Sequence, residues 1–135
     1  MLGLLYKNLK HQKFEMYYIS KEFHFSASHQ LCNLPADHPC SRLHGHNYIV
    51  ILMLKSPSLD KNNFVQDYRE LDAFKKYIDD HIDHRHLNDI FKNNQVTAEF
   101  MAKYFYDWCK DKIPYLYAVK VSETPKTWAT YKAEN

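Results

Sequence analysis

The sequence predicts an α+β fold in which an antiparallel four-stranded sheet carries two helices on one side. Two segments with two-residue alternation come first, two segments with helical periodicity follow, and two alternating segments end the chain. The resulting order, ββααββ, is typical of an antiparallel sheet whose helices lie together. The chain has 135 residues, which suits one domain with its own core, and we place this domain at residues 16–135. Residues 1–15 are basic and weakly patterned, so we expect an N-terminal tail there.

Two long alternating segments form the predicted first pair of strands. Apolar residues alternate with polar ones from Tyr17 to His29, and His29 ends the apolar face. Residues 30–43 form a long loop, a feature that is usually functional in a compact domain. The second strand begins at His44, and both of its faces are apolar because the opposite face carries Ile49, Ile51 and Met53. A strand of this kind needs cover on both faces, which indicates a partner subunit.

Two amphipathic helices and two short strands follow. The first helix begins after a capping-box-like pair, Asp67 and Glu70, and its apolar residues recur at helical spacing: Leu71, Phe74, Ile78 and Ile82. We expect it to end near residue 83 and to be followed by a loop at 83–88. The second helix begins at Thr97, a good N-cap, and its apolar stripe is Met101, Tyr104, Phe105 and Trp108. The last strands are predicted at residues 117–123 and 128–132, with a turn at 124–126.

Composition argues against several classes of function. The formal net charge is +2 and no dense run of Lys or Arg is present, so we expect no nucleic-acid partner. No apolar run approaches the ~20 residues needed to span a bilayer, so we expect no membrane association. The three cysteines cannot all pair, and no secretory signal is visible, so we expect reduced thiols and a cytoplasmic location.

Three histidines form a candidate metal site. His44 and His46 are two residues apart in a predicted strand, so their imidazoles point to the same face. His29 points inward at the end of the neighbouring predicted strand. Three imidazoles and one open position suit a catalytic Zn²⁺ ion. The alternative is that these histidines lie on the surface or form hydrogen bonds in the core.

A thiol and a carboxylate–imidazole pair are candidates for proton chemistry. Cys40 precedes His44 by four residues, and the spacing allows two roles. The thiolate could be a fourth zinc ligand that closes a structural site, or a base beside the metal. Asp83 and His84 are adjacent and could form an acid/base unit, although the same residues could be no more than a charged helix end.

Two carboxylates are candidates for substrate binding. Glu123 ends the apolar alternation of a predicted strand, where a carboxylate must be paired. Its two oxygens match a planar pair of donors such as an amino-pyrimidinone edge, whereas a solvated strand end is the alternative. Glu99 is a second candidate, but a carboxylate in the first turn of a helix is also favoured by the helix dipole.

Several short segments together resemble the 6-pyruvoyl-tetrahydropterin synthase / 6-carboxytetrahydropterin synthase family. Their order and separations match from about Tyr17 to Tyr131, and the segments are Phe25–His29, Cys40–Tyr48, Val65–Tyr68, Asp83–Asn88, Thr97–Glu99, Glu123–Thr124 and Ala129–Tyr131. Three residues separate Cys40 from His44. That spacing is similar to the 6-carboxytetrahydropterin synthase branch of the queuosine pathway, whereas the pyruvoyl-forming branch typically has a longer gap.

The resemblance implies a fold and an activity. The fold would be the tunnelling fold (T-fold), and the protein would be a homo-oligomer, a trimer or a dimer of trimers, with active sites at subunit interfaces. The activity would be that of a zinc-dependent lyase converting 7,8-dihydroneopterin triphosphate to 6-carboxy-5,6,7,8-tetrahydropterin, acetaldehyde and triphosphate. The alternative within the family is a 6-pyruvoyl-tetrahydropterin synthase, which eliminates triphosphate but keeps the side chain. A non-catalytic zinc or pterin-binding module is the alternative of a different class.

The resemblance also implies roles by matched position. The zinc ligands would be His29, His44 and His46. The proton relay would consist of Cys40, Asp83 and His84. The pterin would bind to Glu123, with help from Glu99 and Thr97. Gln30 stands where many relatives have arginine, and the triphosphate could then be held by Arg42, Lys21 or Lys126.

Overall fold

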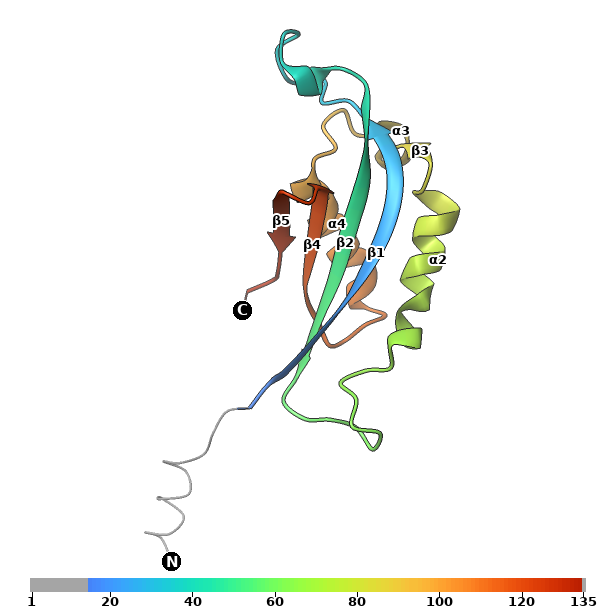
Figure 1. Cartoon of the computed structure of the whole chain (residues 1–135), viewed down its shortest axis with the longest axis vertical. Coiled ribbons are helices and arrows are strands. Elements are labelled where there is room, and N and C mark those ends of the chain that lie inside the picture. The colour runs from blue at the N-terminus through green and yellow to red at the C-terminus, as the bar shows by residue number, and fades with distance from the viewer. Residues whose placement is uncertain (1–14, 135) are drawn as a thin grey trace, which may run out of the picture.

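A long antiparallel hairpin forms the centre of the molecule. The structure is a computed structural model that describes residues 15–134, so the predicted N-terminal tail lies outside the described residues, apart from Glu15. Strands β1 (Tyr17–His29) and β2 (His44–Ser56) pair along their whole length. The loop that joins them extends beyond the rest of the sheet and includes one 3₁₀ turn, Pro39–Ser41 (Figure 1).

The sheet has the order β3-β1-β2-β4-β5. Strands β4 (Leu116–Thr124) and β5 (Thr127–Tyr131) continue it as antiparallel neighbours, so the predicted set of four antiparallel strands is confirmed. A fifth strand, β3 (Arg85–His86), pairs parallel to β1 at the edge of the sheet. The sequence did not predict β3, because two residues are too short to show alternation.

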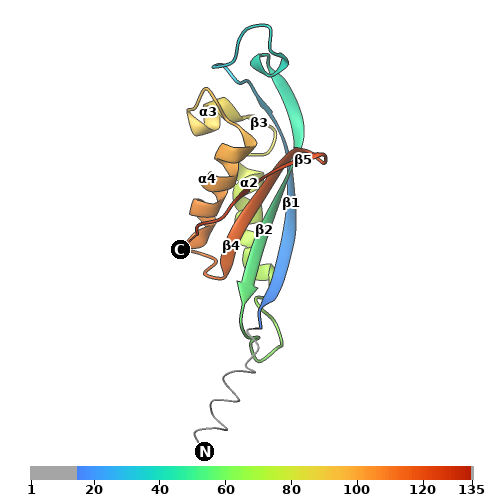
Figure 2. The same cartoon turned by 90° about the vertical axis from the view of Figure 1, so that its left-hand side faces the viewer.

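The helices gather on one face of the sheet. Helices α2 (Asp72–His81) and α4 (Ala98–Lys110) both cover this face, as the edge-on view in Figure 2 shows. A 3₁₀ turn, Tyr68–Leu71, precedes α2, and a short helix, α3 (Leu87–Phe91), follows β3. The expectation of a loop throughout 83–88 was therefore wrong, because this segment docks against β1 and becomes ordered there. Within residues 15–134, no helix is both long and apolar enough to cross a bilayer.

The core lies between the sheet and the two long helices. Phe25 of β1, Phe74 of α2 and Phe105 of α4 are buried, and the Phe105 ring meets each of the other two edge to face. On the opposite face of the sheet, no helix of residues 15–134 covers β2, whose apolar side chains Ile49, Ile51 and Met53 are half-buried in the single chain. The two-sided apolar character of this strand is therefore present in the fold, and one face remains available for a partner.

We expect Phe105→Ala to destabilise the domain by about 3–5 kcal/mol, because it removes a fully buried ring between the helices and the sheet. Urea unfolding measures the change. Phe64→Ala is the matched control, since the Phe64 side chain is 46% exposed, and it should change the free energy of unfolding by less than about 1 kcal/mol. Equal losses in the two variants would contradict the assigned core.

Candidate active site

Three histidines converge at the end of the central hairpin. His29 and His44 are cross-strand partners, and His46 lies two residues further along β2, on the same face. One ring nitrogen from each residue lies within 4.8 Å of those of the other two, so the group could hold a metal ion. His29 is fully buried, whereas the other two are half-buried. The convergence predicted from the sequence is therefore present in the structure.

Backbone carbonyls orient two of the three imidazoles. The Nδ1 atom of His29 lies 2.7 Å from the Val96 carbonyl oxygen, and the Nδ1 atom of His44 lies 2.7 Å from the Arg42 carbonyl oxygen. Because a carbonyl only accepts hydrogen bonds, each Nδ1 carries a proton, which leaves Nε2 as the nitrogen of each ring that can bind a metal ion. Partners of this kind are typical of histidines that bind metals.

The arrangement of the Nε2 atoms fits a bound cation. The Nε2 atoms of His29 and His44 lie 2.9 Å apart, and two lone pairs at that distance need a positive charge between them. The Nε2 atom of His46 is buried and has no hydrogen-bond partner. Three nitrogen donors in this state suit a transition-metal ion such as Zn²⁺.

Burial favours the metal-binding form of two of the three imidazoles. Desolvation lowers the pKa of His29 and of His46, although the nearby Glu123 carboxylate acts in the opposite direction. A lowered pKa means that each ring stays neutral at neutral pH. Metal ions bind the neutral form of histidine, so these histidines would not require a proton to be displaced.

Glu123 connects the histidine cluster to a neighbouring hollow. One oxygen of its half-buried carboxylate lies 3.6 Å from Nε2 of His46. Glu123 also lines a hollow of about 410 Å³. Thr97 and Glu99 line the same hollow, so the three residues predicted to bind substrate are brought together. The Thr97 hydroxyl accepts a hydrogen bond from the Phe100 amide as the N-cap of α4, so its O–H donor and its second lone pair remain available.

Cys40 lies in the loop that joins β1 to β2. It is half-buried within the 3₁₀ turn, its carbonyl accepts a hydrogen bond from the Leu31 amide, and its own amide donates to the His38 ring. Among the described residues, the group that could hold a metal contains the three histidines and not Cys40. The other two thiols differ, since Cys32 is exposed and burial raises the pKa of Cys109 to about 12.

Asp83 and His84 form a rigid pair on the edge of β1. One Asp83 oxygen accepts a hydrogen bond from the Ser26 amide at 2.9 Å, and the other accepts from Nδ1 of His84 at 2.7 Å. The His84 amide in turn donates to the Ser26 carbonyl at 2.6 Å. The Ser26 amide and the His84 side chain hold the pKa of Asp83 below its usual range. Asp83 is therefore ionised and orients the exposed imidazole.

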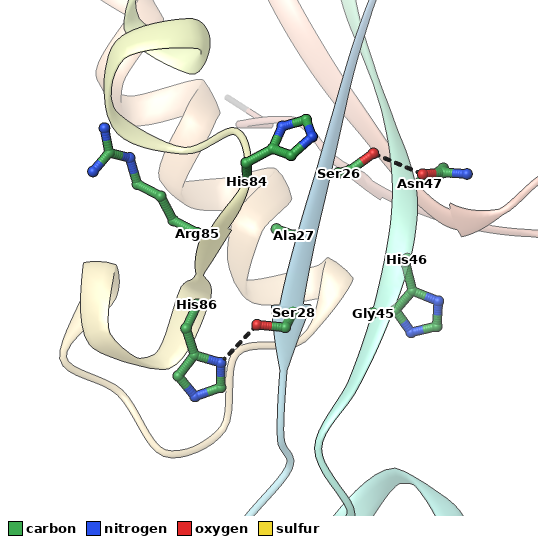
Figure 3. Close-up of a pocket in the computed structure, with 9 residues that line it drawn as sticks. All are labelled: Ser26, Ala27, Ser28, Gly45, His46, Asn47, His84, Arg85 and His86. Atoms are coloured by element: carbon green, nitrogen blue, oxygen red, sulfur yellow. Dashed lines mark hydrogen bonds between the residues drawn. The ribbon is translucent and has the colours of Figure 1, made fainter.

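His84 lines a second hollow, of about 500 Å³, rather than the one beside Glu123. Figure 3 shows it beside β1, near Ser26 and Asn47, whose side chains are hydrogen-bonded to each other. Strand alternation directs the Ser26 and Asn47 side chains to the face opposite to His29 and His44. The predicted pair is thus formed, and of the three clustered histidines only His46 lines the same hollow as His84.

The sequence did not identify Tyr48 as part of the site. Its side chain is fully buried and its hydroxyl has no hydrogen-bond partner. Its ring meets the rings of His46 and His29 at 5.4 Å and 5.9 Å. Its hydroxyl was the available signal, because the next side chains on the same face of β2, Val50, Leu52 and Leu54, are all apolar.

Comparisons with known proteins agree on one family. Residues 18–134 match the family model described as 6-pyruvoyl tetrahydropterin synthase. A Bacillus subtilis protein named 6-carboxy-5,6,7,8-tetrahydropterin synthase is 31% identical over 145 residues, which cover 98% of this chain and 94% of the relative. A Drosophila melanogaster 6-pyruvoyl tetrahydrobiopterin synthase is 30% identical, with 85% and 79% covered. The structure of the Caenorhabditis elegans 6-pyruvoyl tetrahydropterin synthase superposes with a TM-score of 0.77 at 27% identity, covering 91% of this chain and 99% of that one.

We expect His29→Ala to abolish stoichiometric metal binding, because it removes the buried donor that the Val96 carbonyl orients. Metal analysis after dialysis against Zn²⁺ measures the bound ion per chain. His24→Ala is the matched control, because His24 lies on the opposite face of the same strand and is exposed. Retention of one metal ion per chain by His29→Ala would rule out the three-histidine site.

Proposed function

The chain belongs to the 6-pyruvoyl tetrahydropterin synthase family, and on this basis we propose that it is a zinc-dependent lyase acting on 7,8-dihydroneopterin triphosphate. The products would be 6-carboxy-5,6,7,8-tetrahydropterin, acetaldehyde and triphosphate. The observation that carries the proposal is the cluster of three histidines, one of which, His46, lies 3.6 Å from the Glu123 carboxylate. A metal site and a carboxylate at the edge of a hollow are what such a substrate needs.

The three histidines would hold the zinc ion. When bound, it would polarise oxygens of the substrate side chain and lower the pKa of a coordinated hydroxyl. The histidines leave a fourth position open, because Cys40 lies outside their cluster. This arrangement favours catalysis over the alternative of a closed, structural zinc module.

Protons would be moved by Cys40 and by the Asp83–His84 pair. A thiolate near a metal ion is favoured by the positive charge and can act as a base. Asp83 holds Nδ1 of His84 and leaves Nε2 available to exchange a proton with substrate. Glu123 would accept hydrogen bonds from the amino-pyrimidinone edge of the pterin, with Glu99 and Thr97 beside it in the same hollow.

A complete site would require two copies of the chain. His84 shares its hollow with His46, but neither Cys40 nor Glu123 lines that hollow. A neighbouring subunit could present its own His84 to the Cys40 and metal of the first. The half-buried apolar residues on the uncovered face of β2 support such an assembly, since they need cover.

The spacing between Cys40 and His44 is the feature that favours one of the two candidate reactions over the other. The relatives of the chain include proteins named for both activities, so overall similarity does not decide between them. Three residues lie between Cys40 and His44, and this short gap resembles the 6-carboxytetrahydropterin synthase branch. We therefore prefer the carbon–carbon lyase, with the 6-pyruvoyl tetrahydropterin synthase reaction as the second candidate.

A product assay separates the two reactions. We expect the zinc-loaded protein to release acetaldehyde and triphosphate in equal amounts from 7,8-dihydroneopterin triphosphate. Acetaldehyde is measured through NADH consumption by alcohol dehydrogenase, and the metal-stripped protein serves as the control. Triphosphate without acetaldehyde would indicate the 6-pyruvoyl reaction. Release of neither product, by a protein that still binds the pterin, would leave a binding module and overturn the proposal.

Complementation between variants tests the shared site. We expect Cys40→Ala and His84→Ala each to lose turnover, while both still bind one zinc ion per chain. Mixed, dissociated and reassembled, the two variants should regain about a quarter of the activity, because random assembly of two subunit types restores that share of sites. Cys32→Ala is the control and should stay active, since its thiol is exposed in the loop. Absence of recovery in mixed assemblies would show that one chain supplies both residues.

A further inference from the structure

His38 lies between two parts of the proposed active site. It lines the hollow of about 410 Å³ that Thr97, Glu99 and Glu123 also line. It is also the N-cap of the 3₁₀ turn that contains Cys40, two residues further along the chain. His38 therefore belongs both to the wall of the proposed pterin site and to the turn that carries the proposed base.

Hydrogen bonding defines which atom of the His38 ring is available to a ligand. The Cys40 amide donates to Nδ1 of His38 at 3.1 Å, so Nδ1 carries no proton. The proton of the neutral ring then lies on Nε2, which makes Nε2 a donor. Among residues 15–134, Cys40 is the one hydrogen-bond partner of this imidazole. The side chain thus has one free N–H, on a ring whose other nitrogen is bound to the Cys40 backbone.

The backbone of His38 is held on both sides. Its amide donates to the Pro35 carbonyl at 2.9 Å, and its carbonyl accepts from the Ser41 amide at 3.0 Å and from the Ser41 hydroxyl at 2.7 Å. Pro39 follows, and a proline restricts the backbone of the residue before it. The imidazole is therefore attached to a well-ordered turn, and a ligand that meets it is placed relative to Cys40.

A pterin in this hollow needs donors as well as carboxylates. Ionised Glu99 and Glu123 side chains only accept hydrogen bonds. The amino-pyrimidinone edge that would bind Glu123 also carries a carbonyl oxygen beside its two donors, and that oxygen needs an N–H or O–H partner. Gln95, Thr97 and His38 all line the hollow and have donors. Of these three, His38 is the one bonded to the Cys40 amide.

We propose that His38 is a substrate-contacting residue that also positions Cys40: its Nε2–H donates to the carbonyl oxygen of the pterin ring, while its Nδ1 holds the Cys40 amide. The inference rests on the proposed function, and in particular on pterin binding beside Glu123. A pterin bound to His38 is fixed relative to the Cys40 thiol, because one imidazole meets both. His38 thus contributes to substrate affinity and to the placement of the base.

Two substitutions separate the two hydrogen bonds. In His38→Asn the amide oxygen takes the place of Nδ1 and accepts from the Cys40 amide, since asparagine is a good N-cap, but no N–H remains at the position of Nε2. In His38→Gln the longer side chain carries its NH₂ group near the position of Nε2, and the acceptor at the position of Nδ1 is lost. All variants also carry Cys32→Ala, so that the exposed thiol of Cys32 does not react.

Two readouts in the zinc-loaded protein follow the two bonds. Binding of 7,8-dihydroneopterin, titrated by fluorescence, should weaken roughly three- to tenfold in His38→Asn and stay within about twofold in His38→Gln. Alkylation of Cys40 by iodoacetamide without pterin, followed by mass spectrometry, should keep its rate in His38→Asn. In His38→Gln the rate should rise about threefold or more, because the turn loses its cap and the half-buried thiol becomes more accessible.

His24→Asn is the matched control, because His24 is exposed and lines a separate hollow beside α2. It should leave both readouts unchanged, and urea unfolding checks the fold of every variant. Full pterin affinity in His38→Asn would overturn the inference, as would equal losses of affinity in His38→Asn and His38→Gln. An unchanged alkylation rate in His38→Gln would contradict the link to Cys40.

These results would leave the proposed function intact, because the parent protein with His38 in place would still bind the pterin. A parent protein that binds no 7,8-dihydroneopterin would count against the proposed function itself. It would also remove the ligand on which the inference depends, so the two failures are distinguished by the parent protein alone.

Discussion

The antiparallel register between β1 and β2 is the constraint on which the rest of the site depends. It sets His29 opposite His44 and places His46 on the same face. A slip of one residue would turn His29 to the other face, together with the Phe25 ring that anchors the core. The register is protected because the same strand faces carry the buried core residues further down the hairpin. Stability and metal binding therefore select the same pairing.

Helix α4 is linked to the site through the backbone that precedes it. The Val96 carbonyl that orients His29 comes directly before Thr97, the N-cap of the helix. Packing of α4 on the sheet thus fixes the position of a ligand that belongs to β1. The same turn contributes Thr97 and Glu99 to the hollow beside Glu123. One helix start therefore orients a metal ligand and lines the proposed substrate site.

The two faces of the sheet carry different groups of residues. The face toward the helices holds the core and, beyond it, the histidines, Tyr48 and Glu123. The opposite face is uncovered in the single chain, and along it lie the Ser26 side chain and the half-buried apolar residues of β2. The hollow lined by His84 includes that Ser26 side chain. Assembly with other copies would cover the apolar residues and could bring His84 to a site, so stability and catalysis would again have a common origin.

The sequence by itself determined the strands, the long helices and the histidine cluster. Each of these features is predicted from a local repeat of apolar residues or from i, i+2 spacing, and such patterns can be recognised without knowing how the rest of the chain folds. The alternation ended at Glu123, whose carboxylate lies 3.6 Å from Nε2 of His46 in the structure. Strand β3 and helix α3 escaped prediction because elements of two and five residues are too short to show a period. They are ordered by docking against β1.

Only the tertiary structure decided how distant segments meet. The Val96 carbonyl is 67 residues from His29, and the Asp83 carboxylate is 57 residues from the Ser26 amide that it accepts from, so no local pattern reports either contact. That the Tyr48 hydroxyl is buried without a partner also follows only from the packing around it. The hollow that His84 shares with His46 likewise forms only because Arg85 and His86 pair with β1. These features follow from long-range packing, which a linear pattern does not encode.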